Sequence, residues 1–76
     1  MLDAVVVGRV IQCCRERKKR SQELVSGFAG IGRTHLSAIE RGERRPTLET
    51  FWKIAEALGM KPSELMAEIE RELEKG

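Results

Sequence analysis

Two short stretches with helical spacing, separated by a glycine, lie at residues 21–42 and constrain the fold more than any other feature. Ser21 can cap the first helix, because its hydroxyl oxygen can accept a backbone N–H of the first turn. Gly30 can end that helix, because glycine readily enters the left-handed region. A second helix is expected at residues 33–41, and Gly42 supplies its stop. Two short helices connected in this way predict a helix-turn-helix motif.

Helical spacing also assigns an apolar face to each of these helices. In the first, three- and four-residue spacing predicts a buried face made of Leu24, Val25 and Phe28. In the second, Leu36 and Ile39 fall on one side of a helical wheel. We therefore expect both helices to be amphipathic and to pack on a common core.

The other side of the second helix carries short polar or cationic side chains, namely Arg33, Thr34, Ser37, Ala38 and Arg41. A helix without bulky apolar groups on its outer side fits into a DNA major groove about 12 Å wide, where arginine is the commonest reader of guanine. The alternative interpretation is an ordinary solvated helix face.

Charge is unevenly distributed along the chain. The 76 residues carry a net charge of only +2, which by itself does not indicate a nucleic-acid binder. Basic residues gather at 15–20, before the first helix of the motif, and at 41–45, after the second. Both clusters flank the helix that would enter the groove, where phosphates lie, although cations also favour helix C-termini through the macrodipole.

Two adjacent cysteines, Cys13 and Cys14, are accompanied by a single histidine, His35. Adjacent cysteines rarely bridge each other, and a metal site needs more ligands than these residues supply. We therefore expect a reduced, cytoplasmic protein without a metal or cofactor, in which Cys14 is a small core residue. Residues 2–11 lack a secretion pattern and no apolar run reaches about 18 residues, so that neither secretion nor a membrane partner is indicated.

The whole chain predicts an all-α fold of five helices. The first is expected at residues 3–18, with a buried face made of Ala4, Val7, Ile11 and Cys14. Thr47 can cap a fourth helix, for which the expected apolar face is Leu48, Phe51, Trp52, Ala55 and Leu58. Pro62 suits the first turn of a fifth helix that continues towards Lys75.

The chain resembles the Cro/C1-type (XRE) helix-turn-helix family, which includes phage repressors and restriction-modification controller proteins. The resemblance covers about residues 7–66 and is carried by Ser21-Gln22, Ala29-Gly30-Ile31, Arg33-Thr34, Leu36-Ser37, Ile39-Glu40-Arg41-Gly42, Pro46-Thr47-Leu48-Glu49-Thr50, Lys53-Ile54-Ala55 and Ala57-Leu58-Gly59. It implies a compact, five-helix, lambda-repressor-like DNA-binding domain at 1–66, followed by a C-terminal helix extension at 67–76.

The resemblance also implies roles for particular residues. The base-reading positions of the recognition helix would be Arg33, Thr34, Ser37 and Ala38. Together with the two basic clusters, it suggests phosphate contacts from Gln22, Arg20, His35, Arg41, Arg44 and Arg45, with packing as the alternative for His35. Arg15 and Glu40 match a pair that in this family joins the first helix to the recognition helix.

Several positions depart from the family pattern, among them Val25 and Ser26, where leucine and alanine are typical, and Gly27 inside the first helix of the motif. Gly32 stands where a serine or threonine usually caps the recognition helix. Lys19 and Arg20 replace what are commonly a glycine and a leucine. Arg20 therefore cannot provide the usual buried apolar contact, and we expect it to reach a phosphate instead.

The fifth helix looks longer than one small domain requires. Four apolar residues fall within an arc of about 100° on its wheel, namely Leu65, Met66, Ile69 and Leu73. The preceding helices look too short to cover Ile69 and Leu73, so we expect a homodimer interface along this arc. A solvated tail is the alternative.

Two classes of function remain open. The first is a sequence-specific, double-stranded DNA-binding transcriptional regulator that acts as a homodimer on a pseudo-palindromic operator. The second is an antitoxin-like module that holds a partner protein, with DNA binding secondary. An enzyme is not expected, because one histidine and the lack of a phosphate-cradling glycine loop leave no catalytic arrangement.

Overall fold

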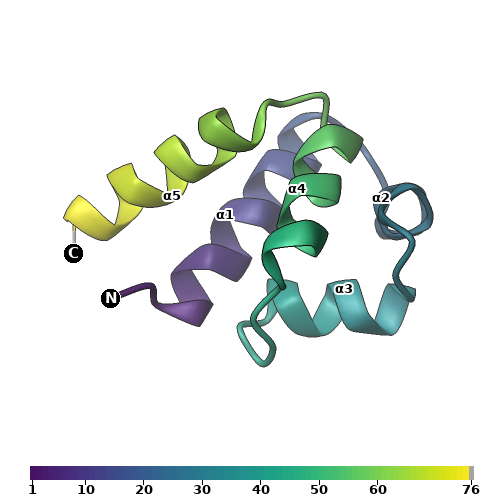
Figure 1. Ribbon diagram of the computed structural model, residues 1–76, viewed down its shortest axis with the longest axis horizontal. Coiled ribbons are helices and arrows are strands. Elements are labelled where there is room, and N and C mark those ends of the chain that lie inside the picture. Colours follow the sequence, from purple (N-terminus) through teal and green to yellow (C-terminus); the bar gives the residue numbers. More distant parts are fainter. Residues whose placement is uncertain (76) are drawn as a thin grey trace.

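A computed structural model describes residues 1–75 and contains five α-helices in that range. The helices are α1 (Ala4–Arg17), α2 (Gln22–Ala29), α3 (Arg33–Glu40), α4 (Leu48–Ala57) and α5 (Pro62–Lys75). In Figure 1, α1 and α4 form the centre, α2 and α3 lie on one side, and α5 runs beside α1 on the other. The all-α prediction is confirmed. Residue 76, the last of the expected extension, lies outside the described residues.

The expected helix ends are present. The Ser21 hydroxyl oxygen accepts the backbone N–H of Leu24 at 3.0 Å, and the Thr47 hydroxyl accepts that of Thr50 at 3.0 Å. Gly30 follows α2 with φ at 71°, in the left-handed region that favours glycine. These local signals fix where α2 and α4 begin and where the turn before α3 starts.

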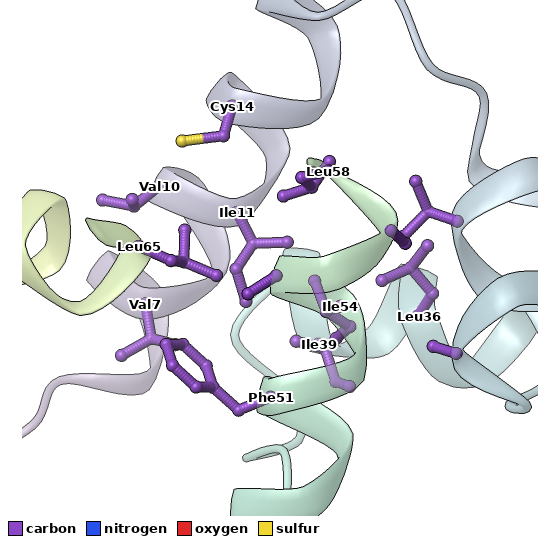
Figure 2. Packing of buried hydrophobic residues seen from close by; sticks show 14 of the residues in the cluster. Val7, Val10, Ile11, Cys14, Leu36, Ile39, Phe51, Ile54, Leu58 and Leu65 are labelled. Atoms are coloured by element: carbon purple, nitrogen blue, oxygen red, sulfur yellow. The ribbon is translucent and has the colours of Figure 1, made fainter. Parts of the chain in front are cut away.

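The core lies where all five helices meet, and Figure 2 shows how its side chains pack. α1 contributes apolar residues at helical spacing, and Cys14, in the last turn of this helix, is fully buried, as expected. Burial raises the pKa of the Cys14 thiol, which keeps it protonated at neutral pH. The buried hydrophobic residues are Val7, Val10, Ile11, Cys14, Val25, Ala29, Leu36, Ile39, Phe51, Ile54, Ala55, Ala57, Leu58, Leu65 and Ile69.

The predicted apolar face of α2 is wrong in two of its three residues. Leu24 is 57% exposed and Phe28 is 62% exposed, whereas Val25 and Ala29 are buried. α2 packs on α3 and α4 through the side that carries Val25 and Ala29, which leaves Leu24 and Phe28 outside the contact.

The predicted face of α4 needs a similar correction at two positions. Leu48 is exposed and so is Trp52, while Ile54 takes a fully buried place that the prediction left out. In α1, Ala4 is only half-buried, whereas Val7, Ile11 and Cys14 are buried as expected.

The interface expected along α5 is also contradicted at its centre. Leu65 is fully buried and Ile69 is 1% exposed within this single chain, and Leu73 packs partly on the same core. The reason is that α1 is as long as α5 and runs beside it, so the two helices cover each other. Of the four residues, Met66 is the exposed one.

Candidate nucleic-acid interface

Five side chains form what we call the outer face of α3. Four belong to the helix and the fifth follows it directly: Arg33, Thr34, Ser37, Ala38 and Arg41. Leu36 and Ile39 are fully buried on the opposite side, which fixes the rotation of the helix about its axis. Arg33, Thr34 and Arg41 are exposed, whereas Ser37 and Ala38 are half-buried. The structure therefore presents the predicted base-reading residues on one accessible side.

A shallow hollow lies between this outer face and the start of α2. It is lined by Gln22, Arg33, Thr34, Ser37 and Arg41. The lining contains two guanidinium groups, two hydroxyls and an amide, and no carboxylate. Such groups donate hydrogen bonds to phosphate oxygens and to the acceptor atoms of guanine.

A polar network that joins α1 to α3 lies next to this hollow. Arg15 of α1 donates from Nε to Glu40 Oε2 at 2.7 Å and from Nη2 to Glu40 Oε1 at 3.1 Å. The Glu40 side chain is only 3% exposed, so its negative charge is compensated by a bidentate arginine rather than by water. The hydrogen bond with Glu40 raises the pKa of Arg15 above its ordinary value. The pair that the family resemblance implies thus joins α1 to α3.

Gln22 extends this network to the accessible surface. Its Nε2 donates to Glu40 Oε1 at 2.9 Å, and its Oε1 accepts from Arg33 Nε at 3.4 Å. The amide is therefore oriented by a buried carboxylate, and it holds the first arginine of the outer face. An amide nitrogen carries two N–H groups, so one remains for a phosphate oxygen.

The arginines expected at phosphates fall into different environments. Arg44 is exposed. Arg41 forms a bidentate ion pair with Glu43, with Nε–Oε2 at 2.9 Å and Nη2–Oε1 at 3.0 Å. Arg45 Nη1 donates to the carbonyl oxygen of Leu2 at 2.6 Å and ties the N-terminal segment to the turn before α4.

Arg20 is placed differently from the expectation. It is half-buried, and its Nη1 donates to the carbonyl oxygen of Ala57 at the C-terminal end of α4. A cation at this position satisfies a carbonyl that the helix leaves unpaired and interacts favourably with the helix dipole. The guanidinium therefore packs against the C-terminal end of α4 instead of pointing into solvent. His35 is half-buried and lies between the outer and buried sides of α3.

Sequence reasoning missed two contributors to this region. Glu43 lies two residues after Arg41, a separation that brings side chains together in a turn and not on a helix. Leu2 contacts Arg45 through its backbone, and a backbone contact leaves no signal in the residue type.

Metal-binding clusters and membrane-spanning helices are both absent from the described part of the chain. Among residues 1–75, no group of three or more His, Cys, Asp or Glu residues could hold a metal ion. The same residues include no helix with the length and apolar character needed to span a membrane.

Known proteins resemble this chain in both sequence and structure. A family model described as helix-turn-helix matches residues 13–65. The control protein C.MunI from a Mycoplasma species is 38% identical over 58 residues, which is 76% of this chain and 78% of that protein. The restriction-modification controller protein C.AhdI from Aeromonas hydrophila has a TM-score of 0.79 at 34% identity, covering 86% of this chain and 98% of that one.

One of the similar structures contains DNA. It is a tyrosine-to-phenylalanine variant of the controller protein C.Esp1396I, bound to its highest-affinity operator site. Its TM-score is 0.85 at 25% identity, and the match covers 95% of each chain. The motif, the five-helix fold and these relatives agree, and the chain belongs to the Cro/C1-type helix-turn-helix family of DNA-binding transcriptional regulators.

Proposed function

We propose that this chain is a sequence-specific transcriptional regulator that binds double-stranded operator DNA through the outer face of α3. The observation that carries the proposal is the cationic hollow beside α3, in which Gln22 holds Arg33 and is itself held by Glu40. A base-contacting side chain that is already oriented loses less side-chain entropy on binding than a side chain that moves freely, and this favours recognition of one DNA sequence over another.

The exposure and the hydrogen-bond partners of the polar residues around α3 suggest a different role for each group. Arg33, Thr34, Ser37 and Ala38 read base edges, with Arg33 directed at a guanine. Gln22 and Arg44 contact phosphates and position the helix. Arg20 and Arg45 hold the fold together through the backbone carbonyls of Ala57 and Leu2. The proposal gives no residue a catalytic role.

The protein acts as a homodimer on a pseudo-palindromic operator in this proposal. The support is an apolar hollow of about 200 Å³ between the N-terminal segment, the start of α4 and the middle of α5. Exposed apolar side chains stand around it, namely Leu2, Leu48 and Met66. Exposed groups of this kind, together on one face, are typical of protein contact surfaces.

A second copy of the same chain is the occupant that fits this face. The molecule is 31 Å along its longest axis. In the proposed dimer the two α3 helices lie about one DNA turn, roughly 34 Å, apart, as half-site spacing requires, and this separation is comparable with the length of one molecule. This interface replaces the one that was expected through the buried residues Leu65 and Ile69.

Selection from a random duplex library, followed by titration of the selected duplex at several salt concentrations, tests the proposal. A dimer with about eight to ten phosphate contacts gives a slope of log affinity against log salt on the order of −7 to −9. A flat salt response would contradict binding through the cationic surface. Recovery of no duplex at all would favour the antitoxin-like alternative, in which a partner protein is the main ligand.

A further inference from the structure

Arg41 stands at the C-terminal end of the outer face of α3, one helical turn after Ser37. Its Nη1 donates to the Ser37 hydroxyl, and its Nε and Nη2 donate to the carboxylate of Glu43. A guanidinium has five N–H groups, so these three bonds leave two for DNA. The side chain is thus held along the outer face instead of sampling solvent freely.

Glu43 is an acid within a basic cluster. The residues around it at 41–45 include Arg41, Arg44 and Arg45, and the nearby hollow beside α3 is lined only by cations and neutral polar groups. A carboxylate at this position repels phosphates, and it neutralises one of the two arginines that line the hollow. The sequence-independent attraction between the protein and DNA is therefore weaker than the number of arginines suggests.

We propose that Glu43 determines specificity by clamping Arg41, so that Arg41 acts along the reading helix and not as a general phosphate contact. The inference rests on the proposed function, since it concerns how the outer face of α3 discriminates among sequences. Glu43 is a positioning residue in this account: its carboxylate orients Arg41 and opposes binding to DNA that lacks the operator.

The ion pair is exposed, but its geometry gives the Arg41 guanidinium one defined orientation. Both carboxylate oxygens are used, at 2.9 and 3.0 Å, which fixes the plane of the guanidinium as well as its position. Ser37, itself on the outer face, fixes the other end of the same group. The hydrogen bond from Arg41 lowers the pKa of Glu43, so the carboxylate remains charged at neutral pH.

Glu43→Gln tests the inference, because it removes the charge and keeps the shape. The variant and the wild type are titrated against the selected operator duplex and against a duplex of equal length without the site, at several salt concentrations. With Arg41 released, affinity for the second duplex rises by up to about fivefold per subunit, the effect of one exposed ion pair. The salt slope becomes steeper by about one per subunit. The ratio of specific to non-specific affinity falls.

Two control variants separate the clamp from a general charge effect. Glu70→Gln removes the same charge on the exposed side of α5, which lies away from α3 in Figure 1. We expect it to leave the specificity ratio unchanged. Glu43→Asp keeps the charge but shortens the side chain, and it should give an intermediate ratio because the bidentate geometry is lost.

The outcomes distinguish this inference from the proposed function. Wild-type protein that binds no duplex contradicts the proposed function and this inference with it. A wild type that binds, with Glu43→Gln equal to it in salt slope and in specificity ratio, overturns the inference alone. A Glu43→Gln variant that loses operator affinity and relaxes its preference at one C·G pair also overturns it, because Glu43 would then read cytosine directly.

Discussion

Gly8 of α1 lies directly against the backbone of Ile39 in the recognition helix, so closely that a Cβ atom at Gly8 would overlap the Ile39 carbonyl oxygen. The same Cβ would lie 2.6 Å from the carbonyl oxygen of Glu40. Both neighbours are backbone atoms at the end of a packed helix, and neither can rotate away as a side-chain tip can. The position of α3 on α1 therefore depends on the absence of a side chain at this residue.

Replacement of Gly8 by alanine should lower the free energy of unfolding by about 1 to 3 kcal/mol, because the added methyl group forces α1 and α3 apart. Gly27→Ala is the matched control, since Gly27 is also a helical glycine, but a Cβ atom added there would meet nothing within 4 Å apart from its chain neighbours and the backbone of its own helix. That control should raise stability by up to about 1 kcal/mol, the difference in helix propensity. Urea denaturation of both variants checks the opposite signs, and two changes of the same sign would contradict the packing argument.

The helix ends could be predicted from the sequence because they depend on neighbouring residues. Ser21, Gly30 and Thr47 act within one turn of the chain, and the structure has each of them where the local chemistry predicts. The outer face of α3 was predictable for the same reason. Leu36 and Ile39 mark the buried side of the helix, and the helical repeat then places the remaining polar residues on the opposite, exposed side.

Contacts between distant parts of the chain could not be predicted in this way. The helical period places Ile69 on the apolar side of the fifth helix, but it does not show that α5 packs on α1 and α4 and that Ile69 is buried within a single chain. The role of Gly8 leaves no signal in the neighbouring sequence, because it depends on the helix that lies opposite. The turn that brings Glu43 onto Arg41 follows no fixed period, so this feature of the site needed the structure.

Lys19 adopts a left-handed backbone conformation, with φ at 57°. This conformation costs about 1 to 2 kcal/mol for a residue with a Cβ atom, and the position commonly holds glycine in the family that the chain resembles. Lys19→Gly should raise the free energy of unfolding by about 0.5 to 1 kcal/mol, after part of the gain is offset by the greater freedom of glycine in the unfolded chain.

Lys18→Gly is the matched control for this change. Lys18 has φ at −88°, and the substitution removes the same exposed positive charge one residue earlier. It should lower stability, because glycine adds unfolded-state entropy and relieves no strain. Thermal unfolding followed by circular dichroism compares the two variants. Equal effects at both positions would show that charge, and not backbone conformation, is responsible.

Arg33 and Arg44 should respond differently to truncation. Arg33 lines the hollow and is held by Gln22, whereas Arg44 is exposed in the basic cluster after α3. Arg33→Ala should lose about 1 to 3 kcal/mol on the operator and relax the preference at one base pair, whereas Arg44→Ala should weaken binding to all sequences alike. Binding to a panel of single-base operator variants measures both. Equal losses across the panel for Arg33→Ala would make Arg33 a phosphate contact.

The proposed dimer face gives a prediction that separates assembly from folding. Leu48 is 78% exposed and Met66 is 37% exposed, so glutamates at both positions leave the core intact. Leu48 is the first residue of α4, where a negative charge is favoured by the helix dipole. The double variant Leu48→Glu, Met66→Glu should keep the helical circular dichroism of the wild type and sediment as a monomer, because a two-fold contact brings the added charges of both copies together.

Two single variants complete this test. Ile69→Glu should unfold the chain, because a carboxylate at a position only 1% exposed has no partner to offset its desolvation. Leu24→Glu places the same charge on the exposed side of α2, away from the proposed face, and should remain a dimer. Sedimentation velocity at micromolar concentration distinguishes the species. A wild type that is itself monomeric would contradict an interface around Leu48 and Met66. A double variant that sediments with the wild-type dimer would also contradict it, because a shared apolar contact cannot accommodate four like charges without separating the two chains.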